Sequence, residues 1–153
     1  MNSYAKFMTL LLTIIAVTFA CSSVPQFSDV MDKDWNLIAV RDSSGNIIFD
    51  RNNMTEESFG DFFTLRFDKE RVNGVGAPNR YFAPYTLPDN KQEIAIKTVA
   101  QSQMAALFEL EELKEHEFFF YLQNAIKWNL AGGNLELHST DKDGATVVLV
   151  FAP

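Results

Sequence analysis

Short stretches in which apolar and polar residues alternate recur along most of the chain, and they constrain its fold more than any other feature. In FFTLRFD, the apolar residues Phe63, Leu65 and Phe67 stand at every second position. Successive side chains of a β-strand point to opposite faces, so this spacing predicts a strand with one buried face. The turn residues RDSSGN between DWNLIAV and IIFD predict a hairpin. The repeated pattern predicts an antiparallel sheet.

One segment lacks this alternation and predicts a helix. From Ser102 to Ile126 the chain contains no Gly or Pro and is rich in Ala, Leu, Glu and Met. Its apolar residues recur at spacings near three and four, which predicts a helix face packed on the sheet. That face comprises Met104, Phe108, Leu110 or Glu111, Phe118, Leu122 and Ile126. The expected fold class is α+β: a curved antiparallel sheet or partly open β-barrel with one main helix packed against it.

The first twenty residues, MNSYAKFMTLLLTIIAVTFA, have the features of a secretion signal. Lys6 precedes an uncharged run from Phe7 to Phe19, and Ala20 stands directly before Cys21. A helix of this length is too short for the ~30 Å of hydrocarbon in a bilayer, which argues against a permanent membrane helix. We expect residues 1–20 to be a signal peptide.

The stretch TFAC resembles a bacterial lipobox, the site at which a cysteine is lipidated and becomes the mature N-terminus. Ala20 and Cys21 match that pattern, whereas Thr18 and Phe19 depart from it. Cys21 is the only cysteine in the chain, so it cannot form an internal disulfide. We therefore expect Cys21 to be a lipid anchor, residues 21–33 to be the lipidated N-terminus and a tether, and residues 34–153 to be the domain. By resemblance to lipoprotein sorting, Ser22 after the cysteine favours the outer membrane of the cell envelope, with the domain in the periplasm or at the surface.

A glycine-rich loop, RVNGVGAPNRYFAPY, stands between two predicted strands. Gly74-x-Gly76-x-x-Asn79 begins like a dinucleotide-binding fingerprint, but it lacks the third glycine and no helix follows it. The structural interpretation is that Gly74 and Gly76 permit a sharp turn or bulge, Pro78 fixes one backbone angle, and Asn79 hydrogen-bonds the loop.

Four short motifs stand in order along the chain: Trp-x-Leu, the glycine loop with its tyrosines, QSQMAA, and the helix pattern E-x-x-F-x-x-x-L. Their matching residues are Trp35, Leu37, Gly74, Asn79, Tyr81, Tyr85, Met104, Ala105, Glu115, Phe118 and Leu122. The combination resembles the META/HslJ-like domain family of bacterial envelope lipoproteins over roughly Asp34 to Ala152. The resemblance implies a barrel-like antiparallel sheet with a helix, and it brings no general catalytic mechanism.

In two positions the chain departs from the family pattern. Pro78 and Ala106 occupy slots that hold cysteine in relatives, which suggests that these cysteines are neighbours and can pair. We therefore expect Pro78 and Ala106 to lie close together, with the loop of residues 74–79 resting against the start of the helix.

The composition argues against several classes of function. The net charge is −7 and no basic stripe is present, so nucleic acid is a poor partner. No metal or cofactor is indicated: His116 and His138 have no partner ligand at suitable spacing, and DKDG lacks the remaining ligands of a calcium loop. The glutamates of the helix segment predict a solvated face, and no nucleophile motif is present, so we do not expect an enzyme.

Two functions remain. The first is a non-enzymatic envelope lipoprotein, held in the membrane by its lipid, that binds a protein partner in envelope assembly or stress protection. The second is a binding module for a lipid or another apolar ligand inside an opened barrel, lined by some of the 14 phenylalanines.

Overall fold

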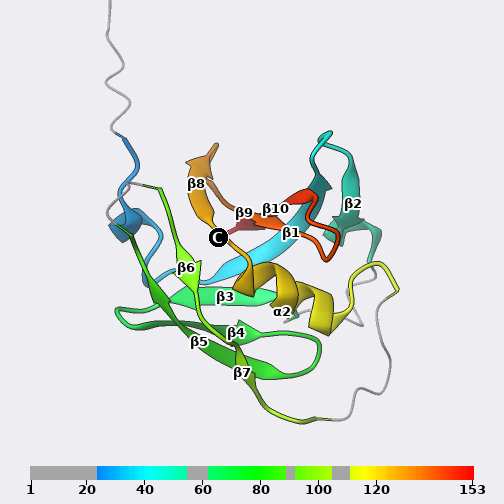
Figure 1. Cartoon of the computed structure of the whole chain (residues 1–153), viewed down its shortest axis with the longest axis horizontal. Coiled ribbons are helices and arrows are strands. Elements are labelled where there is room, and N and C mark those ends of the chain that lie inside the picture. Colours follow the sequence, from blue (N-terminus) through cyan, green and yellow to red (C-terminus); the bar gives the residue numbers. More distant parts are fainter. Residues whose placement is uncertain (1–23, 55–61, 89–91, 105–110) are drawn as a thin grey trace, which may run out of the picture.

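The computed structural model describes residues 24–54, 62–88, 92–104 and 111–153, and Figure 1 shows them as a strongly curved sheet. Within these ranges lie ten strands, the helix α2 (Glu115–Gln123), and two 3-10 helices, η1 (Phe27–Asp29) and η2 (Arg51–Asn53). The strands are β1 (Trp35–Asp42), β2 (Ile47–Asp50), β3 (Thr64–Phe67), β4 (Arg71–Val75), β5 (Arg80–Thr86), β6 (Ala95–Ile96), β7 (Ala100–Gln101), β8 (Lys127–Ala131), β9 (Asn134–Thr140) and β10 (Thr146–Ala152). The predicted fold class is confirmed.

The sheet is open and antiparallel. Its strand order is β6-β5-β4-β3-β1-β10-β9-β8, with β2 paired to β1 and β7 paired to β5. The two ends of this order approach each other at an isolated bridge between Glu93 and Lys127. There the backbone N–H of Trp128 donates to the carbonyl of Gln92 at 2.8 Å. The result is a barrel-like sheet whose end strands are not paired along their length.

The hairpin turn predicted at RDSSGN is present, and an aspartate organises both this turn and the turn between β9 and β10. Asp42 and Asp141 each accept hydrogen bonds, at 2.8–2.9 Å, from the backbone N–H groups two and four residues ahead. Gly45 and Gly144 provide the positive φ angles, +84° and +82°, that these connections need. DKDG is thus the turn between β9 and β10.

Packing of the core begins before Asp34, within residues predicted from the sequence to form the tether. Phe27 of η1 packs against Phe67, Tyr85 and Trp128, with ring centroids 5.1–5.5 Å apart. Val30 is fully buried, and its carbonyl accepts a hydrogen bond from the Trp35 indole at 2.9 Å. The polar residues around Phe27 suggest a tether in the sequence, but its ring is buried by residues 40 to about 100 positions away.

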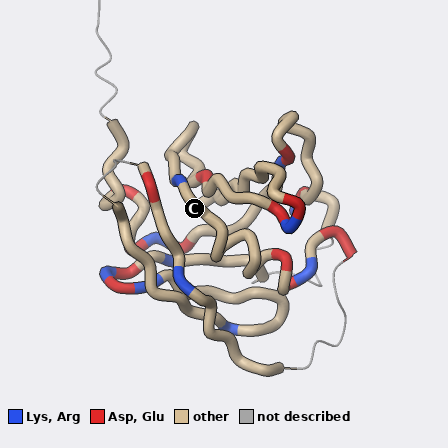
Figure 2. Tube along the Cα trace, in the orientation of Figure 1, with Lys and Arg blue, Asp and Glu red and all other residues tan. Residues whose placement is uncertain are grey.

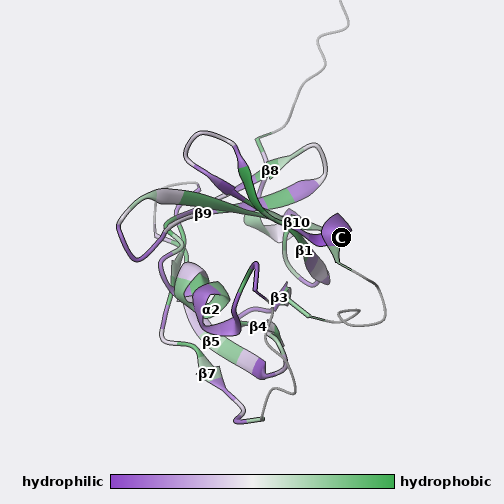
Figure 3. Ribbon diagram, turned by 90° about the vertical axis from the view of Figure 1, so that its right-hand side faces the viewer, coloured by the Kyte–Doolittle hydropathy of each residue, from purple (hydrophilic) through white to green (hydrophobic). Residues whose placement is uncertain are grey.

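Helix α2 lies between the two halves of the curved sheet. Figure 3 shows it between β8–β10 with β1 on one side and β3–β5 with β7 on the other. Phe118 and Leu122 are fully buried, as predicted, and the Phe118 ring lies 5.1 Å from that of Phe63 and 5.9 Å from that of Tyr81. The helix therefore fills the interior of the sheet with aromatic side chains.

The helix is shorter than its sequence predicts. It begins at Glu115 rather than Ser102, and its first turn is capped by a hydrogen bond from the Lys114 backbone N–H to the Glu117 carboxylate at 3.0 Å. After Asn124 the chain turns toward β8, so Ile126 is 63% exposed instead of buried. Met104, 59% exposed, lies outside the helix, and Phe108 lies outside the described residues.

These positions give a test of the helix face. Phe118→Ala should lower the free energy of unfolding by about 3–5 kcal/mol, because it removes a fully buried ring. Ile126→Ala should change it by less than about 0.5 kcal/mol, because the side chain is exposed. Urea denaturation measures both, and equal losses would contradict this assignment.

Candidate functional site

Gly74 and Tyr81 form a structural unit across the strands β4 and β5. They stand directly opposite each other in the ladder, and the Tyr81 hydroxyl donates to the carbonyl of Thr64 on β3 at 2.8 Å. A Cβ atom at Gly74 would overlap that same carbonyl oxygen. Burial raises the pKa of the Tyr81 phenol well above its ordinary value, so it remains a neutral donor. Gly74 is therefore needed for a close approach between strands.

The carboxylate of Glu115 binds the loop between β4 and β5. Its Oε1 atom accepts hydrogen bonds from the backbone N–H groups of Ala77 and Asn79, each at 2.6 Å. Its Oε2 atom accepts a third from the Asn79 side chain at 2.7 Å. We call this set of contacts the Glu115 clasp. A Cβ atom at Gly76 would lie 2.5 Å from Oε1, so glycine leaves the space that the carboxylate occupies.

Asn79 extends these contacts to a third segment. The residue is buried, and its Oδ1 atom accepts hydrogen bonds from the Ser102 hydroxyl at 2.9 Å and from the Met104 backbone N–H at 2.7 Å. These bonds, with that from the Ser102 N–H to the carbonyl of Arg80, hold residues 102–104 beside β5, which is why the predicted helix does not begin there. The side chain of Met104 takes no part in them.

The loop does make a sharp turn, as expected, because the Gly76 N–H donates to the carbonyl of Asn79 at 2.6 Å. Neither Gly74 nor Gly76 has a positive φ angle. They are needed instead where the loop closely approaches Thr64 and Glu115. The loop does rest against the start of the helix, as expected, and the Ala77–Pro78 peptide is cis. Ala106 lies outside the described residues, so its proximity to Pro78 remains a prediction.

The remaining motif residues also make structural contacts. The Trp35 indole donates to the carbonyl of Val30, and the Tyr85 hydroxyl donates to the carbonyl of Asp68 at 2.7 Å. Phe118 and Leu122 are core residues. These motif residues therefore contribute to the packing and hydrogen bonding of the domain.

A cleft of about 430 Å³ lies on the outer face of β3, β4 and β5. The outward residues Arg66, Asn73 and Phe82 are paired in register across the three strands, and Ala100 of β7 continues the row. Their inward neighbours, which include Phe67, Val72 and Tyr81, are buried. The lining residues are Asp34, Thr64, Leu65, Arg66, Arg71, Asn73, Gly74, Val75, Arg80, Tyr81 and Phe82. We call this the arginine cleft.

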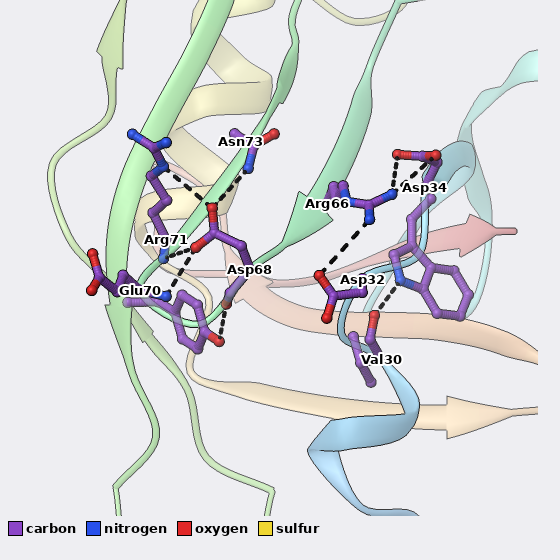
Figure 4. A network of polar contacts seen from close by, with 10 residues as sticks. Val30, Asp32, Asp34, Arg66, Asp68, Glu70, Arg71 and Asn73 are labelled. Carbon is purple, nitrogen blue, oxygen red and sulfur yellow. Dashed lines mark hydrogen bonds and ion pairs between the residues drawn. The ribbon is translucent and has the colours of Figure 1, made fainter.

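Two of its three arginines are paired with aspartates (Figure 4). The Arg66 guanidinium lies 3.3 Å from the Asp34 carboxylate, and that of Arg71 lies 3.3 Å from the Asp68 carboxylate. Hydrogen bonds from the backbone N–H groups of Glu70 and Arg71 hold the pKa of Asp68 below its ordinary value, so the second pair stays charged at neutral pH. In Figure 2, basic and acidic segments gather at the turn between β3 and β4.

The other side of the cleft is formed by Arg80 and Phe82 of β5. Phe82 is 47% exposed, and the Arg71 guanidinium lies 5.7 Å from the centre of its ring. Arg80 is exposed, and none of the ion pairs found among the described residues involves its guanidinium. The cleft thus combines a cation, an amide and an aromatic surface.

Two further features bear on chemistry and membranes. Within the described ranges, no three His, Cys, Asp or Glu residues are grouped so as to hold a metal ion, and no helix is long and apolar enough to cross a bilayer. His138 is half-buried beside Glu136, and burial lowers its pKa. His116 is exposed on α2.

The arginine cleft was not predicted from the sequence. Alternation along each strand indicates which residues point outward, but it does not show that β3 lies beside β4 and β4 beside β5. The available signal was the basic and aromatic residues at outward positions of three consecutive predicted strands: Arg66, Arg71, Arg80 and Phe82.

The Glu115 clasp predicts that removing a single polar side chain lowers the free energy of unfolding. Asn79→Ala should destabilise the domain by about 2–3 kcal/mol, because it removes the acceptor of the Met104 N–H and one donor to Glu115. Glu115→Gln should also destabilise the domain, because the new side-chain NH₂ would face the NH₂ group of Asn79, which is itself a donor. Glu112→Gln, at an exposed position, is the matched control and should be neutral. A urea midpoint unchanged in Asn79→Ala would show that the clasp adds no stability.

Comparisons with known proteins agree with this architecture. A protein from Burkholderia xenovorans, solved by NMR, has a similar fold, with a TM-score of 0.57 at 17% identity over 87% of this chain and 92% of the other. A crystal structure of a DUF4847 family protein from Bacteroides vulgatus gives a TM-score of 0.56 at 12% identity over 82% and 95%. No curated protein matches the chain. The META domain model matches residues 28–152, and the chain belongs to the META domain family.

Proposed function

We propose that this protein is a lipid-anchored envelope lipoprotein whose META domain binds a protein partner through the arginine cleft, without catalysing a reaction. The anchor is supported by the h-region, the lipobox-like TFAC and the solitary Cys21. Outer-membrane location and a role in envelope assembly or stress protection belong to the same proposal. They derive from the resemblance to lipoproteins of this family.

The observation that carries the binding proposal is the composition of the cleft. Arginine and exposed aromatic side chains are enriched in protein interfaces, where they bury large areas and pair with carboxylates. Arg66, Arg71, Arg80 and Phe82 gather on one face of a protein with a net charge of −7. They project from paired strands, so the surface is held rigidly by the sheet.

The same structure favours this function over an apolar ligand inside the barrel. Between helix and sheet, the rings of Phe63, Tyr81, Phe118 and Phe119 lie with their centroids 5.1–5.9 Å apart. Such spacing is that of directly contacting aromatic rings in a packed core. A ligand in that position would have to displace them, whereas the cleft is open on the surface.

The anchor is tested by Cys21→Ser. The wild-type chain should remain in the membrane fraction through a high-salt wash, because several acyl chains hold it by apolar burial rather than by charge. The variant should be soluble or uncleaved, as seen by fractionation and by the mass of the mature protein. Wild-type protein in the soluble fraction after gentle lysis would refute the anchor.

The binding surface is tested by photocrosslinking in intact cells. The crosslinker p-benzoylphenylalanine in place of Phe82 should give a discrete protein adduct, because this exposed ring lines the cleft. The same group in place of Lys142, at the exposed β9–β10 turn, is the control and should not give that adduct. The same adduct from both positions, or none from position 82, would contradict a binding role for the cleft.

A further inference from the structure

The arginine cleft has an uneven distribution of charge that points to the chemistry of its partner. Arg66 is paired with Asp34 at 3.3 Å and also lies 3.8 Å from Asp32, and Arg71 is paired with Asp68. Arg80 also lines the cleft, and none of the ion pairs found among the described residues balances its charge. The strongest attraction for an incoming anion is therefore at Arg80.

Arg80 and Phe82 are presented together. They stand two positions apart on β5, so both side chains project from the outer face about 7 Å apart. Arg80 is fixed at its backbone: its N–H donates to the Ser102 hydroxyl at 3.2 Å, and its carbonyl accepts from the Ser102 N–H at 3.0 Å. A partner with a carboxylate and an apolar side chain at a similar separation can contact both at once.

Asn73 lies beside Phe82 in the adjacent strand. Its Nδ2 atom makes one long contact of 3.5 Å with Asp68, and its Oδ1 atom remains able to accept from an N–H donor. The middle of the cleft therefore suits a polar backbone as well as a side chain. A volume of about 430 Å³ is in the range of sites that hold several groups of a ligand.

The aspartates around the cleft limit which anions can enter. Asp32, Asp34 and Asp68 stand beside the two paired arginines, and the whole chain carries −7. A polyanion such as nucleic acid or an anionic membrane would meet these carboxylates and be repelled. A single carboxylate directed at Arg80 avoids them.

We propose that the arginine cleft binds a short acidic peptide segment of the partner in an extended form, with a carboxylate on Arg80 and the apolar side chain two positions along the peptide on Phe82. This inference rests on the proposed function and adds the chemistry of the partner to it. Guanidinium and carboxylate form paired, charge-assisted hydrogen bonds, so Arg80 selects an acid over an amide.

The test is an NMR titration of the ¹⁵N-labelled full-length chain in detergent. The probe is the acetylated, amidated peptide Ser-Ser-Glu-Ser-Phe-Ser, whose Glu and Phe lie two positions apart, and the matched peptide carries Gln in place of the Glu. The acidic peptide should shift the amide resonances of residues 64–66, 73–75 and 80–82, with at least tenfold weaker binding of the Gln peptide.

Variants assign this binding to the two residues. Arg80→Glu should weaken binding of the acidic peptide at least tenfold, Phe82→Ser should weaken it severalfold, and Arg80→Lys should retain part of it. Lys142→Glu changes the net charge by the same amount as Arg80→Glu, but at an exposed turn outside the cleft. This variant should bind the acidic peptide as the wild type does. Unchanged spectra away from the cleft show that each variant is folded.

Several results would overturn the inference. These are equal binding of the acidic and Gln peptides, equal binding by Arg80→Glu and the wild type, or shifts elicited equally by free glutamate or by anionic phospholipid vesicles. A crosslinked adduct from position 82 without acidic-peptide binding would leave the proposed function standing and reject this inference. Absence of both the crosslinked adduct and acidic-peptide binding would reject the proposed function and this inference.

Discussion

The arrangement of this domain depends on the hydrogen bonds that the Glu115 carboxylate accepts. A loop that runs between a sheet and a helix has backbone N–H groups that cannot all reach water, and each needs a partner. Glu115 accepts from Ala77 and from both donors of Asn79, while Asn79 accepts from Met104. Three segments far apart in the sequence are thereby joined at the start of α2. The helix is held where Phe118 can pack between the two halves of the open sheet.

This organisation separates the family motif from the proposed binding surface. Strands β3, β4 and β5 direct Phe67, Val72 and Tyr81 into the core and Arg66, Asn73 and Phe82 to the outside. Because strand side chains alternate, a rigid interior also fixes the spacing of the outer residues. Of the first set, Tyr81 belongs to the family motif, whose residues hold the fold together through core packing and the Glu115 clasp. The second set forms the arginine cleft, so the fold does not by itself define the partner.

Much of the sheet could be predicted from the sequence, because alternation is a local property. Phe63, Leu65 and Phe67 are buried as their spacing indicates, and Asp-Gly and Ser-Gly turns lie between strands. The errors arose where distant contacts override local preference. The hydrogen bond from the Met104 N–H to Asn79 holds residues 102–104 outside the helix. Phe27 lies in the core because its ring packs against Trp128. The cleft was missed for the same reason: its residues meet only when strand order is known.

The central claim is that the Glu115 clasp holds the loop, and hydrogen exchange of individual amides tests it most directly. The Ala77 and Asn79 N–H groups lie in a loop, yet both donate to Glu115 at 2.6 Å. We predict that in the native protein they exchange as slowly as amides of the β4–β5 ladder, and that Glu115→Ala makes both exchange quickly while β9 and β10 remain protected. Fast exchange of these two amides in the wild-type protein would contradict the account.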